Sequence, residues 1–197
     1  MRTAATAAHR PEDNRNVTTT RIYTTDLPDA DATRAFGTQL ASLLRAGDLV
    51  MLTGDLGAGK TTLTQGIGAG LGIRGQVASP TFIIAREHPS LTDGPALVHV
   101  DAYRLGSLEE VDALDLDSSL DEAVTVVEWG VGLVEGIAGD RIEIVLNRPH
   151  GGIDADTTDI DGAEVGTRAV TLTTFGERWA DVDITFATPA PASHASL

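Results

Sequence analysis

The residues best suited to chemistry form a glycine-rich run that ends in a lysine and two threonines, Gly54-Asp55-Leu56-Gly57-Ala58-Gly59-Lys60-Thr61-Thr62. Residues 54–61 match the phosphate-binding pattern GxxxxGK(S/T). In that pattern the glycines let backbone N–H groups turn toward a phosphate, the lysine reaches the β- and γ-phosphates, and the hydroxyl ligates Mg²⁺. The run therefore predicts a site for a nucleoside triphosphate. We expect Lys60 to act in catalysis and Thr61 to hold the metal. The expected nucleotide-binding residues are Leu56, Gly57, Ala58, Gly59, Lys60, Thr61 and Thr62.

The sequence on either side of this run supplies the elements that would hold it in place. Residues 48–53 are a short apolar run of strand length that follows Gly47. Downstream, Leu63, Ile67 and Leu71 are spaced by four residues, which places them on one face of a helix that Gly72 could end. Strand, glycine-rich loop and helix is the arrangement that directs backbone N–H groups and a helix N-terminus at an anion.

Two further apolar runs end in carboxylates. Residues 96–101 end in Asp101, and the β-branched run 123–127 is followed by Glu128. In an open α/β sheet the ligand lies beyond the carboxyl ends of the strands, so we expect both side chains near the phosphate loop. Each is a candidate for Mg²⁺ coordination, directly or through water, and for alignment of a nucleophile. The pattern leaves open which carboxylate contacts the metal.

The charge and the basic residues restrict the function further. The chain has 29 acidic and 14 basic side chains, a net charge of −15, and Lys60 is its single lysine. Binding of duplex or transfer RNA normally needs a basic patch, so we expect no direct contact with nucleic acid. The guanine-reading pattern (N/T)KxD requires a second lysine, so ATP or ADP is the expected nucleotide rather than GTP.

Two other residues have alternative interpretations. Thr81 follows Pro80, and it could be a switch threonine that senses the γ-phosphate or only the first residue of a strand. His99 lies inside the apolar run 96–101, where a histidine is more often a core residue than a catalyst.

The whole chain of 197 residues fits one α/β domain. We expect a three-layer sandwich of the P-loop NTPase type, with a mainly parallel sheet and an antiparallel hairpin at one edge. The hairpin would cover residues 141–174 and carry an acidic loop, 147–166. The other expected elements are a strand at 20–25, a helix from Asp29 or Asp31 to about Arg45, a strand at 82–85, a turn over 86–95, and short helices at 107–114, 118–122 and 132–137. We expect the domain to span 20–180, with disordered segments at 1–19 and 187–197. The chain has no cysteine and no apolar run long enough to cross a membrane, as expected of a cytoplasmic protein.

Four segments taken together resemble the bacterial TsaE family: GDLGAGKTTL, SPTF, HVDAYRL and VEWG, in this order. Members of that family are P-loop ATPases needed to make N6-threonylcarbamoyladenosine at position 37 of tRNA. The resemblance implies that residues 56–61 hold the phosphates of ATP or ADP, that Thr61 and Glu128 ligate Mg²⁺, and that Asp101 is needed for hydrolysis. It also implies two partner proteins, TsaD and TsaB, which would contact the tRNA while ATP hydrolysis resets their complex between turnovers. Activity without these partners is expected to be low.

A kinase of small metabolites is the main alternative, because many P-loop domains of this size phosphorylate metabolites. Such kinases usually close an arginine-bearing lid over the phosphates. The long loop 147–166 contains Arg148 as its only arginine, which argues against a kinase.

Overall fold

A computed structural model describes residues 21–79, 84–148 and 165–186 of the chain. The two terminal segments that we expect to be disordered, the candidate switch residue Thr81 and nearly all of the acidic loop lie outside these ranges. No helix within the described ranges is long and apolar enough to cross a membrane.

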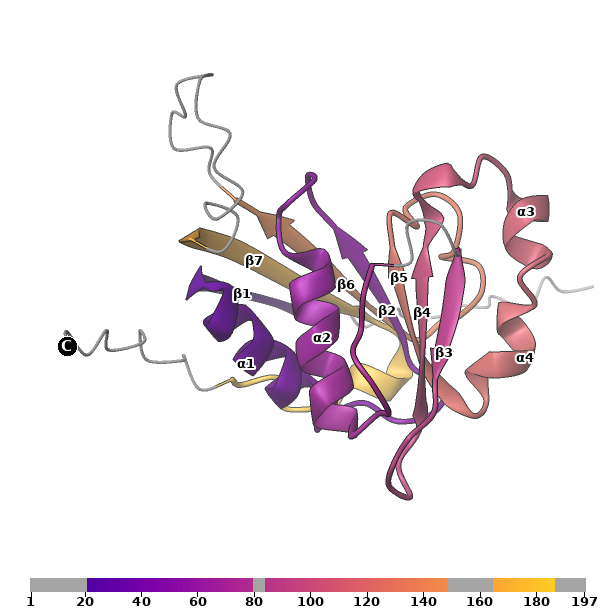
Figure 1. Cartoon of the computed structure of the whole chain (residues 1–197), viewed down its shortest axis with the longest axis horizontal. Helices are drawn as coiled ribbons and strands as arrows, with labels where there is room; N and C mark the ends of the chain where they lie inside the picture. Colours follow the sequence, from indigo (N-terminus) through magenta and orange to yellow (C-terminus); the bar gives the residue numbers. More distant parts are fainter. Residues whose placement is uncertain (1–20, 80–83, 149–164, 187–197) are drawn as a thin grey trace, which may run out of the picture.

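The described residues form one seven-stranded sheet in the order β1-β7-β6-β2-β5-β4-β3 (Figure 1). The four central strands β6, β2, β5 and β4 run parallel to one another, whereas β1, β7 and β3 are antiparallel to their neighbours. The strands are β1 (Arg21–Asp29), β2 (Leu49–Thr53), β3 (Ala85–His88), β4 (Ala96–Asp101), β5 (Ala123–Glu128), β6 (Arg141–Asn147) and β7 (Val165–Phe175). The predicted fold class, with its mainly parallel sheet, is confirmed.

Helices cover both faces of this sheet. In Figure 1, α1 (Ala30–Ala41) and α2 (Lys60–Leu71) lie side by side, and α3 (Leu108–Asp112) and α4 (Leu116–Leu120) lie together on the other side. The central strand β2 contributes to both layers of the core: Val50 and Leu52 pack on the α1–α2 side, and Leu49 and Met51 on the α3–α4 side. All four side chains are buried, as expected for a strand inside a parallel sheet.

Local signals in the sequence fix several helix ends. Asp29 is the N-cap of α1, and its Oδ1 accepts a hydrogen bond from the N–H of Ala32 at 2.7 Å. Ser107 caps α3 in the same way, accepting from the N–H of Glu110 at 3.3 Å. At the end of α2, Gly72 adopts the left-handed conformation with φ of 67°. Of the two predicted caps for the first helix, the structure therefore selects Asp29.

Four local predictions differ from the structure. The helix expected at 132–137 is wrong: the segment is a series of turns, and Gly132 has φ of 81°, which is not helical. The first helix ends at Ala41, because the next turn tightens into i→i+3 hydrogen bonds at Leu43 and Leu44. The turn expected over 86–95 begins with strand β3, which pairs with β4. Finally, β1 pairs with β7 outside the β6–β7 hairpin, so β1 is the edge strand on that side.

The chain after β7 also packs on the core. Trp179, in the 3₁₀ turn Glu177–Trp179, is fully buried, and Phe186 lies edge-to-face against Phe36, with ring centroids 4.7 Å apart. Phe186 also contacts Tyr23 of β1. These aromatic contacts attach the end of the described chain to the α1–α2 side of the sheet.

The helices α1 and α2 approach so closely that glycine is required at their contact. A Cβ atom at Gly66 would lie 2.2 Å from the carbonyl oxygen of Arg34, and one at Gly37 would lie 2.5 Å from that of Leu63. Both obstacles are backbone atoms of the opposite helix, which cannot move without separating the helices. This contact holds α2, and therefore the phosphate loop, in place.

We accordingly expect Gly66→Ala to lower the free energy of unfolding by roughly 1–3 kcal/mol, as over-packed cores do. Gly68→Ala in the same helix is the matched control, since the three atoms nearest to its Cβ would belong to the side chains of Ile73 and Val77 rather than to backbone. Urea denaturation of the two variants and the parent chain measures the difference. Equal stability of the two variants would contradict the close approach of the helices.

Candidate functional site

The predicted phosphate loop connects β2 to α2 at the carboxyl end of the sheet. Gly59 is the N-cap of α2, with φ of 108°, and it has no side chain that could occupy the first N–H groups of the helix. The loop also lies close to β6, because a Cβ at Gly54 would come within 2.3 Å of the carbonyl oxygen of Leu146. The loop thus directs the N-terminus of α2, with its partial positive charge, at the space where an anion could bind.

Lys60 lies inside this loop. Its side chain is only 5% exposed, and Nζ donates hydrogen bonds to the carbonyl oxygens of Gly54 at 2.7 Å and Asp55 at 3.0 Å. Burial lowers the pKa of Lys60, while the nearby carboxylates of Glu128, Asp101 and Asp55 oppose that shift. An anion placed over the loop would therefore meet a buried ammonium group.

Thr61, Glu128 and His99 form a hydrogen-bonded cluster beside the lysine. The Thr61 hydroxyl donates to Oε1 of Glu128 at 3.0 Å, and Nε2 of His99 lies 2.9 Å from the same oxygen. His99 is fully buried and Glu128 is 3% exposed. Two parts of the chain that are far apart in sequence, the start of α2 and the end of β5, thus meet through one carboxylate.

Asp101 ends β4 beside Glu128, its partner in the parallel register between β4 and β5. Its Oδ1 accepts a hydrogen bond from the N–H of Tyr103 at 3.1 Å, which fixes the turn that follows the strand. Asp101 is half-buried, so its carboxylate is more accessible than that of Glu128. The structure therefore brings the two predicted carboxylates together at the same end of the sheet.

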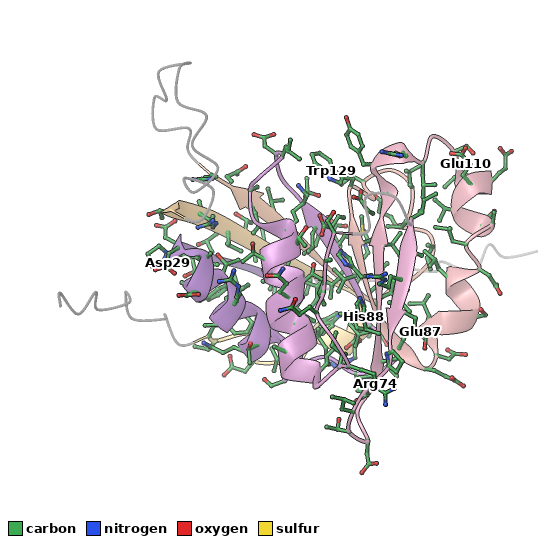
Figure 2. The ribbon with its side chains drawn as sticks, in the orientation of Figure 1. Asp29, Arg74, Glu87, His88, Glu110 and Trp129 are labelled. Carbon is green, nitrogen blue, oxygen red and sulfur yellow. The ribbon has the colours of Figure 1, made fainter. Side chains whose placement is uncertain are left out.

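Two aromatic side chains border the site. Trp129 follows Glu128 in the left-handed conformation, with φ of 64°, which is uncommon for a residue other than glycine and is often found at functional sites. Its ring centroid is 3.9 Å from Nζ of Lys60 and 5.5 Å from the ring of Tyr103. Figure 2 shows Trp129 at the end of the sheet where the phosphate loop lies.

A cavity of about 500 Å³ opens over the loop. Asp101 and Glu128 line it, and so do six of the seven predicted nucleotide-binding residues, Leu56, Gly57, Gly59, Lys60, Thr61 and Thr62. Ala58 is the exception, because its side chain packs into the core on the α1–α2 side. The volume is in the range of small-molecule and cofactor pockets.

Arg168 is the main residue of the site that the sequence did not indicate. It lies on β7, is 1% exposed, lines the cavity and donates from Nη1 to the carbonyl oxygen of Gly166 at 2.7 Å. Its Nε lies only 3.2 Å from the position that a Cβ would take at Gly59. In the sequence Arg168 is an ordinary member of an alternating strand, and only the pairing of β7 with β6 brings it to the loop.

Comparisons with known proteins show which family the chain resembles. The family model for threonylcarbamoyl adenosine biosynthesis protein TsaE matches residues 27–153, more than half of the chain. A TsaE protein of Streptomyces coelicolor is 60% identical over 152 residues, which cover 77% of this chain and 96% of that protein. The TsaE protein of Bacillus subtilis is 38% identical over 140 residues, which cover 70% of this chain and 83% of that protein.

A solved structure is similar as well. The crystal structure of Bacillus subtilis YdiB superposes with a TM-score of 0.56 at 31% sequence identity, covering 82% of this chain and 90% of that one. The family match begins in β1 and includes the phosphate loop and both carboxylate-ending strands. The chain therefore belongs to the TsaE family of tRNA threonylcarbamoyladenosine biosynthesis proteins.

Proposed function

We propose that this member of the family is a Mg²⁺-dependent ATPase that acts on the TsaD–TsaB complex and resets it between rounds of tRNA modification. The observation that carries the proposal is the position of Lys60 and the Thr61–Glu128 pair on one cavity at the carboxyl ends of β2 and β5. A phosphate loop next to a carboxylate at a strand end is the arrangement by which P-loop proteins hold a nucleotide and its metal.

The described residues have distinct roles in this proposal. The N-terminus of α2 and the ammonium group of Lys60 bind the phosphates, and Lys60 exchanges its two loop carbonyls for phosphate oxygens. Asp101 is half-buried at the rim of the cavity, where it orients the attacking water. Trp129 covers Lys60 and keeps water away from it.

Thr61 and Glu128 fit a magnesium site. One supplies a hydroxyl and the other a carboxylate, and Mg²⁺ prefers oxygen ligands, takes few of them from the protein and keeps several waters. Bound Mg²⁺ would neutralise charge on the phosphate oxygens. The Thr61 hydroxyl donates its proton to Glu128, so its lone pairs remain available to a cation.

The choice of ATP rests on the single lysine of the chain, which already lies in the phosphate loop. The choice of partners rests on the family and on charge. A chain with net charge −15 is poorly suited to bind tRNA by itself, which supports a division of labour in which TsaD and TsaB contact the tRNA.

Calorimetric titration of the purified chain tests the nucleotide and the metal together. We expect one ATP site whose affinity falls about tenfold or more when EDTA replaces Mg²⁺, because Thr61 and Glu128 would hold the ion and the ion would neutralise phosphate charge. GTP should bind more weakly than ATP. Equal affinity for both nucleotides, or binding that ignores Mg²⁺, would contradict this assignment.

A further inference from the structure

We propose that His99 is a positioning residue whose imidazole orients Glu128, and through it Thr61, toward the magnesium ion. The inference rests on the proposed function, because it concerns the residues assigned to the metal. It starts from the partner of a buried imidazole: Nε2 of His99 lies 2.9 Å from Oε1 of Glu128, a side chain that we assign to the metal.

The direction of this hydrogen bond follows from the proposed role of Glu128, because a carboxylate that holds Mg²⁺ is ionised. An ionised carboxylate can only accept hydrogen bonds, so Nε2 of His99 must be the donor. The same oxygen accepts the hydroxyl of Thr61 at 3.0 Å. A carboxylate oxygen has about two acceptor positions, so His99 and Thr61 together occupy Oε1. Oε2 is then the oxygen of Glu128 that remains for a metal ion or its water ligands.

Burial makes this arrangement rigid. His99 is fully buried on the central part of β4, next to β5, and the side chain of Glu128 is 4% exposed, so water cannot easily replace either partner. If the imidazole were removed, the carboxylate would lose one of the two donors that fix its rotation. Outer-shell hydrogen bonds of this kind orient metal ligands and typically change metal affinity 10–100-fold when removed.

A second buried histidine, His88, serves as a control that distinguishes a positioning role of His99 from a packing role. His88 lies on β3 and is 5% exposed, two residues along from Arg86, the cross-strand partner of His99. Side chains two residues apart on a strand share a face, so the two histidines lie on the same side of the sheet. His88 instead makes its hydrogen bond to the backbone of Arg74, and Figure 2 shows it beside β3, away from Trp129. His88→Leu thus removes a second buried imidazole, which lies near His99 but makes no hydrogen bond to Glu128.

The test compares His99→Leu, His99→Gln and His88→Leu with the parent chain, using Mg²⁺ titrations of ATP binding by calorimetry. We expect His99→Leu to raise the Mg²⁺ concentration for half-maximal binding by about 10–100-fold, while ATP affinity in EDTA stays unchanged. The amide N–H of His99→Gln can still donate to Glu128, so this variant should recover much of the Mg²⁺ affinity that His99→Leu loses. His88→Leu should have the Mg²⁺ dependence of the parent chain.

A His99→Leu variant with the Mg²⁺ dependence of the parent chain would overturn the inference, and so would an equal loss in His88→Leu. If His99→Leu does not fold, His99→Asn replaces it, because its shorter amide stays polar but falls short of Glu128. Recovery in His99→Gln over His99→Asn supports the inference, and equal values overturn it. A parent chain that binds ATP without regard to Mg²⁺ would instead overturn the proposed function, and the inference with it.

Discussion

Replacing Lys60 by alanine is expected to lower ATP turnover by about 100-fold or more while the chain keeps its fold, as removal of a main charge-stabilising donor does in other enzymes. The ammonium group is the one cation of the loop, and it lies between two loop carbonyls and the ring of Trp129. Alanine leaves the charge that develops on the phosphates without this partner. Steady-state release of phosphate at saturating ATP and Mg²⁺ measures the loss.

Two further variants make the result specific to the ammonium group. Lys60→Met keeps most of the apolar stem and should be as inactive as Lys60→Ala. Arg45→Ala removes an exposed positive charge between α1 and β2, at the opposite end of β2 from the loop, and should retain turnover. Circular dichroism and urea denaturation confirm that each variant is folded. Turnover by a folded Lys60→Ala chain at the parent rate would place the catalytic site elsewhere.

The second large effect is expected for Glu128→Gln. The amide has nearly the size of the carboxylate but lacks its negative charge, so the Thr61–Glu128 pair no longer attracts a divalent cation. We expect turnover to fall by about 100-fold or more, and the Mg²⁺ requirement for ATP binding to be largely lost. Phosphate release and Mg²⁺ titration of ATP binding measure the two effects separately.

Asp101→Asn distinguishes the roles of the two carboxylates. It should reduce turnover strongly yet leave the Mg²⁺ dependence of ATP binding in place, because we assign Asp101 to the water and Glu128 to the metal. Glu143→Gln is the matched control: Glu143 lies on β6, which β2 separates from β5, and it pairs with Arg141 at 2.8 Å. A Glu128→Gln chain with the metal dependence of the parent, or a Glu143→Gln chain that loses it, would contradict the assignment.

The parts of the site that sequence alone predicted are those that local patterns encode. The phosphate loop follows from its glycines, its lysine and the strand and helix that flank it, and the end of α2 follows from Gly72. The positions of Asp101 and Glu128 follow from two apolar strands that each end in a carboxylate. Parallel pairing of β4 with β5 then places the two carboxylates side by side. These features depend on a few consecutive residues.

The parts that sequence missed depend on pairing between distant segments. Arg168 reaches the loop only because β7 lies next to β6, and β3 forms as a strand because β4 satisfies its backbone groups. The sequence favours His99 as a core histidine, and the side chain is indeed buried. Its contact with Glu128, however, depends on the register of β4 against β5, which the sequence does not show. The aromatic contact of Phe186 with Phe36 joins opposite ends of the described chain in the same way.

The most direct test of the proposed role is ATP turnover by the purified chain, measured alone and after addition of the TsaD–TsaB pair. Low turnover that rises strongly with the pair, and does not rise for Lys60→Ala, is the predicted result. Turnover that ignores the pair but increases with a small metabolite would contradict the proposal and identify the chain as a kinase.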